Sequence, residues 1–237
     1  MFGLWEKKTI TDPEKRAKFL KTKERIHQAP EHMFVVTARV QILAEWLGLS
    51  EEVTQQLMKA AALHDAYKAI ERAITKPLRY TYQSFRIAEA AEIASLREAG
   101  VSGELITLQN AGGHDWGTAT ELIEDDDLMD EGWAWLVLYV VDMYSRGTDP
   151  ATGIHDRLAN DREVYTKFHE TAKGNVPGHP EEGGFDAMER TGNAALAKIA
   201  KRISERLGKE VTPEELPMLV DQELNRRIQS LSQNANG

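Results

Sequence analysis

Apolar residues recur with helical spacing over the first third of the chain. In the segment 32–47 they stand two, four, three and four positions apart, at Phe34, Val36, Val40, Leu43 and Leu47. This spacing is typical of one face of an α-helix. Gly48 follows as a residue suited to the left-handed conformation that ends helices. The pattern therefore predicts a helix over 32–47.

The same criteria predict helices along most of the remaining chain. Asp12 and Pro13 form a cap and a first helical residue, which opens a helix toward His27. Ser50 caps the next helix, which we expect to run to Lys68 with His64 on its apolar face. We expect further helices at about 82–99, 102–110, 130–145, 154–170, 185–207 and 215–231, with 111–120 as a loop and cap.

Strand signals are nearly absent, so the predicted fold class is all-α. The run "LVLYVV" at 136–141 has strand propensity, but its flanking pattern favours a buried helix. A turn after Asp149 and a Gly/Pro-rich stretch at 173–184 mark a change in the composition of the chain. We interpret residues 1–150 as a multi-helix core and residues 151–237 as a C-terminal helical extension packed on it.

Composition narrows the classes of partner. The 237 residues carry a formal charge of -9 and no cysteine. This charge disfavours a nucleic-acid partner, and the missing thiols leave His, Asp and Glu as metal ligands. The N-terminus lacks the apolar region of a signal peptide, and no apolar run is long enough to span a membrane. We expect a cytoplasmic protein with no membrane partner.

Three His-Asp doublets occur, in different contexts. His64-Asp65 follows an apolar run and is expected to face the core. His114-Asp115 lies in a glycine-rich loop, where side chains can converge on a site. His155-Asp156 lies in a charged stretch and is expected at the surface.

Two histidines should meet at one end of a helical hairpin. Only two residues separate the helices predicted at 32–47 and 50–68, so His32 and His64 should be neighbours. Asp142 follows a second apolar run and, like Asp65, needs compensation for its buried charge. One divalent cation bound by His32, His64, Asp65 and Asp142 would supply it. The alternative is that each residue is satisfied separately, by a cap, a hydrogen bond or an ion pair.

The order His, His-Asp, Asp on helices resembles the HD-domain superfamily of metal-dependent phosphohydrolases. The resemblance covers about 24–165 and places His32, His64, Asp65 and Asp142 as metal ligands. The sequence "HDAYK" is similar to the HD-x-x-K form of the family, which implies a phosphate-facing role for Lys68. Members with two metals have two further histidines before the last Asp, whereas only His114 is present here. We therefore expect one metal, with His114 contacting substrate phosphate or assisting proton transfer, or else facing solvent.

The resemblance implies hydrolysis of a phosphate ester or anhydride, with a nucleotide or similar small molecule as substrate. The expected cofactor is a divalent ion, with Mn, Fe, Ni, Co, Zn and Mg left open. Lys68, His114 and Asp65 are the expected catalytic residues, and Arg72 or Arg146 could balance phosphate charge. Glu71 could accept a proton or be a solvated charge, and Trp116 could stack a base or pack.

An alternative function is a catalytically inactive module that binds a metal or nucleotide. The extension at 151–237 could cover the pocket, form a homodimer surface or extend the core.

Overall fold

The computed structural model describes residues 13–66, 68–75, 82–113, 116–145, 149–151, 153–156, 158–159 and 184–234. All regular elements within these ranges are helices, and no strand occurs in them. The all-α class predicted from the sequence is confirmed. Of the helix expected at 154–170, residues 154–156 and 158–159 are helical and the rest lies outside the described ranges.

The first two helices form the predicted hairpin. Helix α1 (Pro13–Leu47) and helix α2 (Glu51–Leu63) pack along each other. Gly48 joins them with a φ of 69°, a conformation that glycine adopts without the clash of a Cβ atom. The Ser50 side chain accepts a hydrogen bond from the Val53 amide, which caps α2.

Two boundaries in this hairpin were predicted wrongly. Helix α1 is continuous through Pro30, where we expected separate helices at 13–27 and 32–47. An interior proline removes one backbone hydrogen bond, and here the helix continues through that loss. Helix α2 ends at Leu63 instead of Lys68, so His64 is its C-cap and Asp65 lies in the following turn.

Short helices follow the hairpin. They are α3 (Lys68–Thr75), α4 (Tyr82–Glu98), α5 (Gly103–Gln109), the 3-10 turn η1 (Asn110–Gly113) and α6 (Trp116–Glu124). Much of α6 falls where we expected a loop at 111–120, so that prediction was wrong. The one glycine and two threonines of α6 have low helix propensity, but packing on the core overrides it, because Ala119 is buried and Leu122 and Ile123 are partly buried.

Helix α7 (Asp130–Tyr144) lies at the centre of the core. All of its residues from Ala134 to Tyr144 are buried. A helix that is apolar on every side is stable only when surrounded, and α1, α2, α9 and η1 all contact it. The strand propensity of 136–141 is thus overridden, as the flanking pattern predicted.

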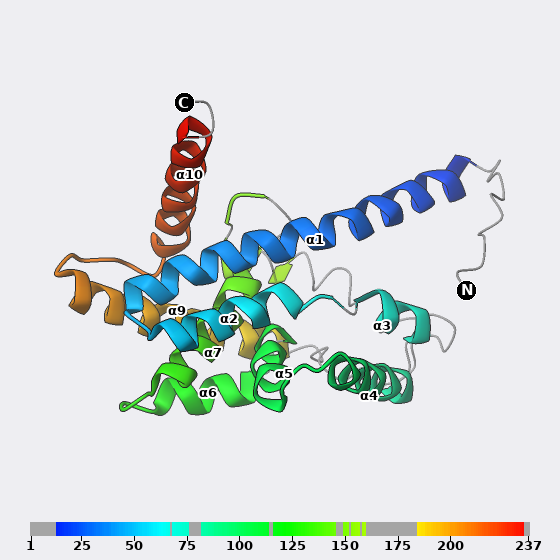
Figure 1. The fold of residues 1–237 in the computed structure, drawn as a ribbon, viewed down its shortest axis with the longest axis horizontal. Coiled ribbons are helices and arrows are strands. Elements are labelled where there is room, and N and C mark those ends of the chain that lie inside the picture. Colours follow the sequence, from blue (N-terminus) through cyan, green and yellow to red (C-terminus); the bar gives the residue numbers. More distant parts are fainter. Residues whose placement is uncertain are drawn as a thin grey trace.

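The last two described helices are α9 (Gly184–Leu207) and α10 (Leu216–Asn234). Helix α9 packs on α1, α6 and α7, and α10 packs on α1. In Figure 1, α1 runs along the length of the molecule, while α10 (red) projects from the side of α1 opposite α6. None of the described helices combines the length and apolar composition that crossing a membrane requires.

Candidate metal centre

His32 lies on α1, on the side of the helix that faces α7. Its residue surface is 8% exposed, and its Nε2 lies 3.3 Å from Asp142 Oδ1. The other ring nitrogen, Nδ1, is buried and has no hydrogen-bond partner within the described part of the chain. A buried polar atom without a partner is costly, and the described residues leave this histidine incompletely satisfied.

His64 enters from the end of α2 with a fixed ring orientation. Its Nδ1 lies 2.7 Å from the Ala61 carbonyl oxygen. A carbonyl can only accept, so Nδ1 carries the hydrogen and donates it. The Nε2 atom of the neutral ring is therefore left with its lone pair directed at Asp142 and His32. Hydrogen bonds of this kind orient the histidines that bind metals in proteins.

The backbone of η1 leaves room for the His64 ring. A Cβ atom added to Gly112 would lie 3.1 Å from His64 Cδ2 and 3.3 Å from its Cβ. These separations are shorter than ordinary van der Waals contacts. Gly112 therefore allows a close approach that a larger residue would oppose.

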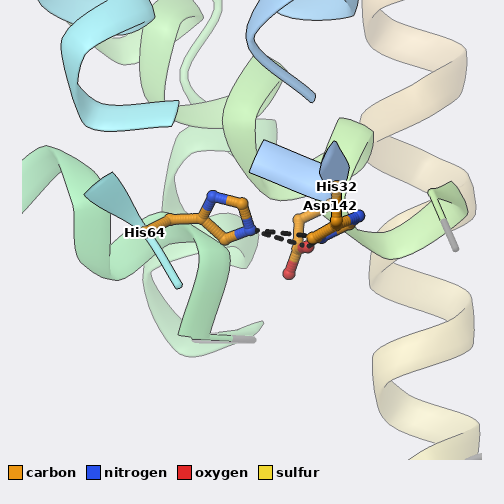
Figure 2. Close-up of side chains that lie close together, drawn as sticks. All are labelled: His32, His64 and Asp142. Atoms are coloured by element: carbon orange, nitrogen blue, oxygen red, sulfur yellow. Dashed lines mark hydrogen bonds and ion pairs between the residues drawn. The ribbon is translucent and has the colours of Figure 1, made fainter. Parts of the chain in front are cut away.

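Asp142 completes a triangle of ligand atoms from three helices (Figure 2). Its Oδ1 lies 3.3 Å from the Nε2 of each histidine, and the two Nε2 atoms lie 3.3 Å apart. The Asp142 side chain is 7% exposed and the His64 side chain 1%. Among the described residues, this is the only group of three or more such side chains whose ligand atoms converge.

The charge of Asp142 controls the protonation of His64. Burial acts to lower the pKa of His64, but the hydrogen bond and the negative charge of Asp142 outweigh it, with a further contribution from Asp65. The net effect raises the pKa from 6.5 to about 9. Without a metal ion, a protonated His64 therefore compensates the buried carboxylate at neutral pH.

The triangle fits the ligand spacing of one metal ion. At bond lengths of about 2.1 Å, two ligand atoms are about 3.4 Å apart at tetrahedral positions and about 3.0 Å apart at adjacent octahedral positions. The observed separations of 3.3 Å lie between these values. Two imidazoles and a carboxylate suit Mn²⁺, Fe²⁺, Co²⁺, Ni²⁺ and Zn²⁺.

Asp65 is not part of the triangle, although we predicted it as a fourth ligand. The Lys68 ammonium lies 3.3 Å from Asp65 Oδ1 and the Asp65 side chain is 20% exposed. The two residues form an ion pair at the start of α3, beside His64. Lys68 is half-exposed, so its charge is accessible at the edge of the site.

The structure describes some of the other predicted residues. Trp116 is partly buried and packs against the core. His155 is 73% exposed and pairs with Glu189, as expected for a surface doublet. His114 and the side chains of Arg72 and Arg146 lie outside the described residues.

Two residues near the site were missed by the sequence analysis. Glu92 on α4 is half-buried, and burial together with the charge of Glu71 raises its pKa. Gln109 on α5 directs its Nε2 toward Glu92 Oε1, at 3.5 Å. Nothing in the local pattern of α4 distinguishes Glu92 from a solvated helix charge, because its role depends on the packing of α3 and α5 against α4.

Comparison with known proteins identifies no relative. No protein-family model, curated protein or solved structure matches the chain.

Proposed function

We propose that this protein is a metal-dependent phosphohydrolase that acts on a nucleotide or a similar small phosphorylated molecule. The observation that carries the proposal is the convergence of His32, His64 and Asp142 from three helices, with 3.3 Å between ligand atoms. The order of these residues along the chain, with Asp65 and Lys68 after His64, also resembles the HD-domain superfamily.

In this proposal the three side chains hold one divalent ion. Such an ion lowers the pKa of a coordinated water and polarises a phosphoryl oxygen. By accepting the hydrogen bond from His64 Nδ1, the Ala61 carbonyl keeps Nε2 directed at Asp142 and His32, the residues that would hold the ion with it. Because two histidines and one aspartate would fill only three coordination positions, such an ion would keep further positions for a water and a phosphate oxygen.

Residues beside the triangle would serve the substrate. Lys68 carries a positive charge at the edge of the site, where it would attract phosphate oxygens after exchanging its contact with Asp65. Glu92, whose pKa is raised by burial and by the charge of Glu71, is the half-buried carboxyl near Lys68 that would take part in proton transfer. Both assignments rest on the proposed reaction.

The test is a phosphate-release assay on protein stripped with a chelator and reloaded with Mn²⁺, Co²⁺ or Ni²⁺. The substrates would be nucleoside mono-, di- and triphosphates, cyclic nucleotides and simple phosphomonoesters. We expect turnover of at least one class, lost on chelation and reduced at least about 100-fold by Asp142→Asn or His64→Asn. His155→Asn is the matched control. This histidine also precedes an aspartate, but it is exposed and pairs with Glu189 instead of with a residue of the triangle.

Ion binding would be measured in parallel by thermal unfolding. An ion at 100 times its dissociation constant should stabilise the wild type by about 2.7 kcal/mol, and Asp142→Asn should lose this effect. A wild type that gains no stability from any of these ions, and hydrolyses no substrate, would overturn the proposal.

The second candidate is a module that binds metal or nucleotide without turnover. The observation favouring it is the Asp65–Lys68 ion pair, which engages a predicted ligand and the predicted phosphate-facing cation with each other. If the protein is such a module, a divalent ion should stabilise it against thermal unfolding, and no substrate should release phosphate. In an enzyme, Asp65→Asn would release Lys68 and should change turnover with ion binding almost unaffected, whereas in a module neither the wild type nor this variant releases phosphate.

A further inference from the structure

A second buried polar cluster lies on α1, two turns beyond His32. Arg39 is 2% exposed, and its guanidinium makes four hydrogen bonds. The partners are Asp221 Oδ1 at 2.8 Å, Asp221 Oδ2 at 3.0 Å, Ser145 Oγ at 2.8 Å and the Asp149 carbonyl at 3.0 Å. An arginine stays charged when buried, so its position is determined by partners such as these.

Asp221 brings α10 into this cluster. Its two carboxylate oxygens accept the paired bonds from Arg39, and Oδ2 also accepts the Ala151 amide at 2.6 Å. The bidentate geometry fixes the orientation of both groups. Helix α10 is thereby tied both to α1 and to the chain that follows α7.

The cluster is connected to Asp142 through Ser145. The Ser145 hydroxyl accepts the bond from Arg39, and the Ser145 amide donates to the Asp142 carbonyl at 3.2 Å. Residues seven apart on a helix lie on the same face. Helices α1 and α7 are therefore joined at two levels, by His32 with Asp142 and by Arg39 with Ser145.

We propose that Arg39 and Asp221 are positioning residues for the metal centre, which set the Asp142 carboxylate by holding the end of α7 against α1. The inference rests on the proposed function only in that the triangle binds an ion. It gives α10, in the C-terminal part of the chain, a defined task at a site whose ligands all precede residue 143.

The chain contains a matched control for this effect. Arg227 on α10 also pairs with a glutamate on α1: its Nη2 lies 2.6 Å from Glu45 Oε2 and its Nη1 3.0 Å from Oε1. This pair joins the same two helices but is more exposed, and neither residue hydrogen-bonds to α7 in the described structure. Weakening it therefore tests the docking of α10 without touching the end of α7.

The experiment is a titration of the full chain, stripped of metal, with Co²⁺. The readouts are the dissociation constant and the visible absorption of bound Co²⁺, which reports coordination geometry. We expect Asp221→Asn to weaken binding at least about tenfold, as loss of an outer partner does at known metal sites, and to change the spectrum. Glu45→Gln should leave the affinity within about twofold of the wild type and the spectrum unchanged, because no metal ligand depends on it.

Ser145→Ala keeps the inference testable if Asp221→Asn does not fold, as judged by circular dichroism. It removes the link between Arg39 and the end of α7 but keeps the ion pair, and we expect about threefold weaker binding. Wild-type affinity and spectrum in both variants would overturn the inference, as would equal weakening by Asp221→Asn and Glu45→Gln. A wild type that binds no Co²⁺ would overturn the metal centre and the inference together, whereas binding without turnover would count against the hydrolase alone.

Discussion

The interface between α1 and α7 holds two buried polar clusters, and they differ in how fully protein groups satisfy their hydrogen-bonding atoms. The Arg39 cluster consists of Arg39, Ser145, Asp221 and the Asp149 carbonyl, with hydrogen bonds of 2.8 to 3.0 Å. The His32 cluster consists of His32, His64 and Asp142, with contacts of 3.3 Å. In the Arg39 cluster one positive and one negative charge balance each other through a bidentate pair.

The difference indicates what each cluster is for. The Arg39 cluster satisfies its charges with protein groups and so stabilises the fold as it stands. The His32 cluster leaves His32 Nδ1 without a described partner and directs two Nε2 atoms at the same carboxylate oxygen. Two Nε2 atoms that lie 3.3 Å apart and share one carboxylate oxygen are a suitable arrangement of metal ligands.

The largest expected effect comes from replacing one residue of each cluster by leucine and comparing the losses of stability. Arg39→Leu leaves Asp221 and Ser145 without their cation and should destabilise the metal-free protein by about 3–5 kcal/mol. His32→Leu removes only long contacts from a residue whose Nδ1 has no partner among the described residues, and should cost less than about 1 kcal/mol. Urea unfolding in the presence of a chelator measures both.

Similar losses from these two substitutions would show that the clusters do not differ as argued. An Arg39→Lys variant sharpens the comparison, because lysine keeps the charge but lacks the planar fork that binds both Asp221 oxygens. We expect it to recover only part of the lost stability.

A second prediction concerns pH in the metal-free protein. The pKa of His64 is raised from 6.5 to about 9 by Asp142, so the folded state favours the protonated ring. The resulting stability, on the order of 3 kcal/mol, is fully present below about pH 6.5 and is lost as the pH rises through about 9. A saturating ion should reverse the trend, because it needs the neutral ring.

Asp142→Asn is the reference for this measurement, since it removes the charge that raises the His64 pKa. The free energy of unfolding would be measured between pH 6.5 and 9 for both proteins with chelator present. Parallel pH profiles for wild type and variant would contradict the assignment.

Much of the His32 cluster followed from the sequence, because it depends on local geometry. A three-residue connection forces α1 and α2 into a hairpin, and His32 and His64 meet beside the C-terminal end of α2 as predicted, with their Nε2 atoms 3.3 Å apart. Asp142 was predicted from the apolar run before it, which places a carboxylate on a buried helix.

The position of Asp65 did not follow from the sequence. His64 is the C-cap residue of α2 and has helical φ and ψ of -55° and -30°. Consecutive residues of a helix project about 100° apart, so His64 facing the core turns Asp65 toward Lys68 instead. The doublet therefore contributes one residue, His64, to the triangle of His32, His64 and Asp142.

The Arg39 cluster could not be predicted at all. Arg39 and Asp221 are 182 positions apart, and neither stands in a motif. Their pairing depends on how α10 packs on α1, which is a property of the whole fold. A charged residue within an apolar helical face was the one available signal, and it identified no partner.

The smallest expected effect tests how tightly the backbone at Gly112 packs against the His64 ring of the His32 cluster. Gly112→Ala would place a Cβ atom 3.1 Å from His64 Cδ2, so the ring must shift by a few tenths of an ångström. Because the bond from His64 Nδ1 to the Ala61 carbonyl resists that shift, Nε2 should move relative to Asp142. We expect about tenfold weaker Co²⁺ binding, or about 1.4 kcal/mol, with a smaller change in the stability of the metal-free protein. Gly103→Ala is the control, since no atom lies within 4 Å of its added Cβ. Equal Co²⁺ affinities in the two variants would mean that the ring has room to adjust, and that the triangle of ligand atoms is less rigid than the contacts around His64 imply.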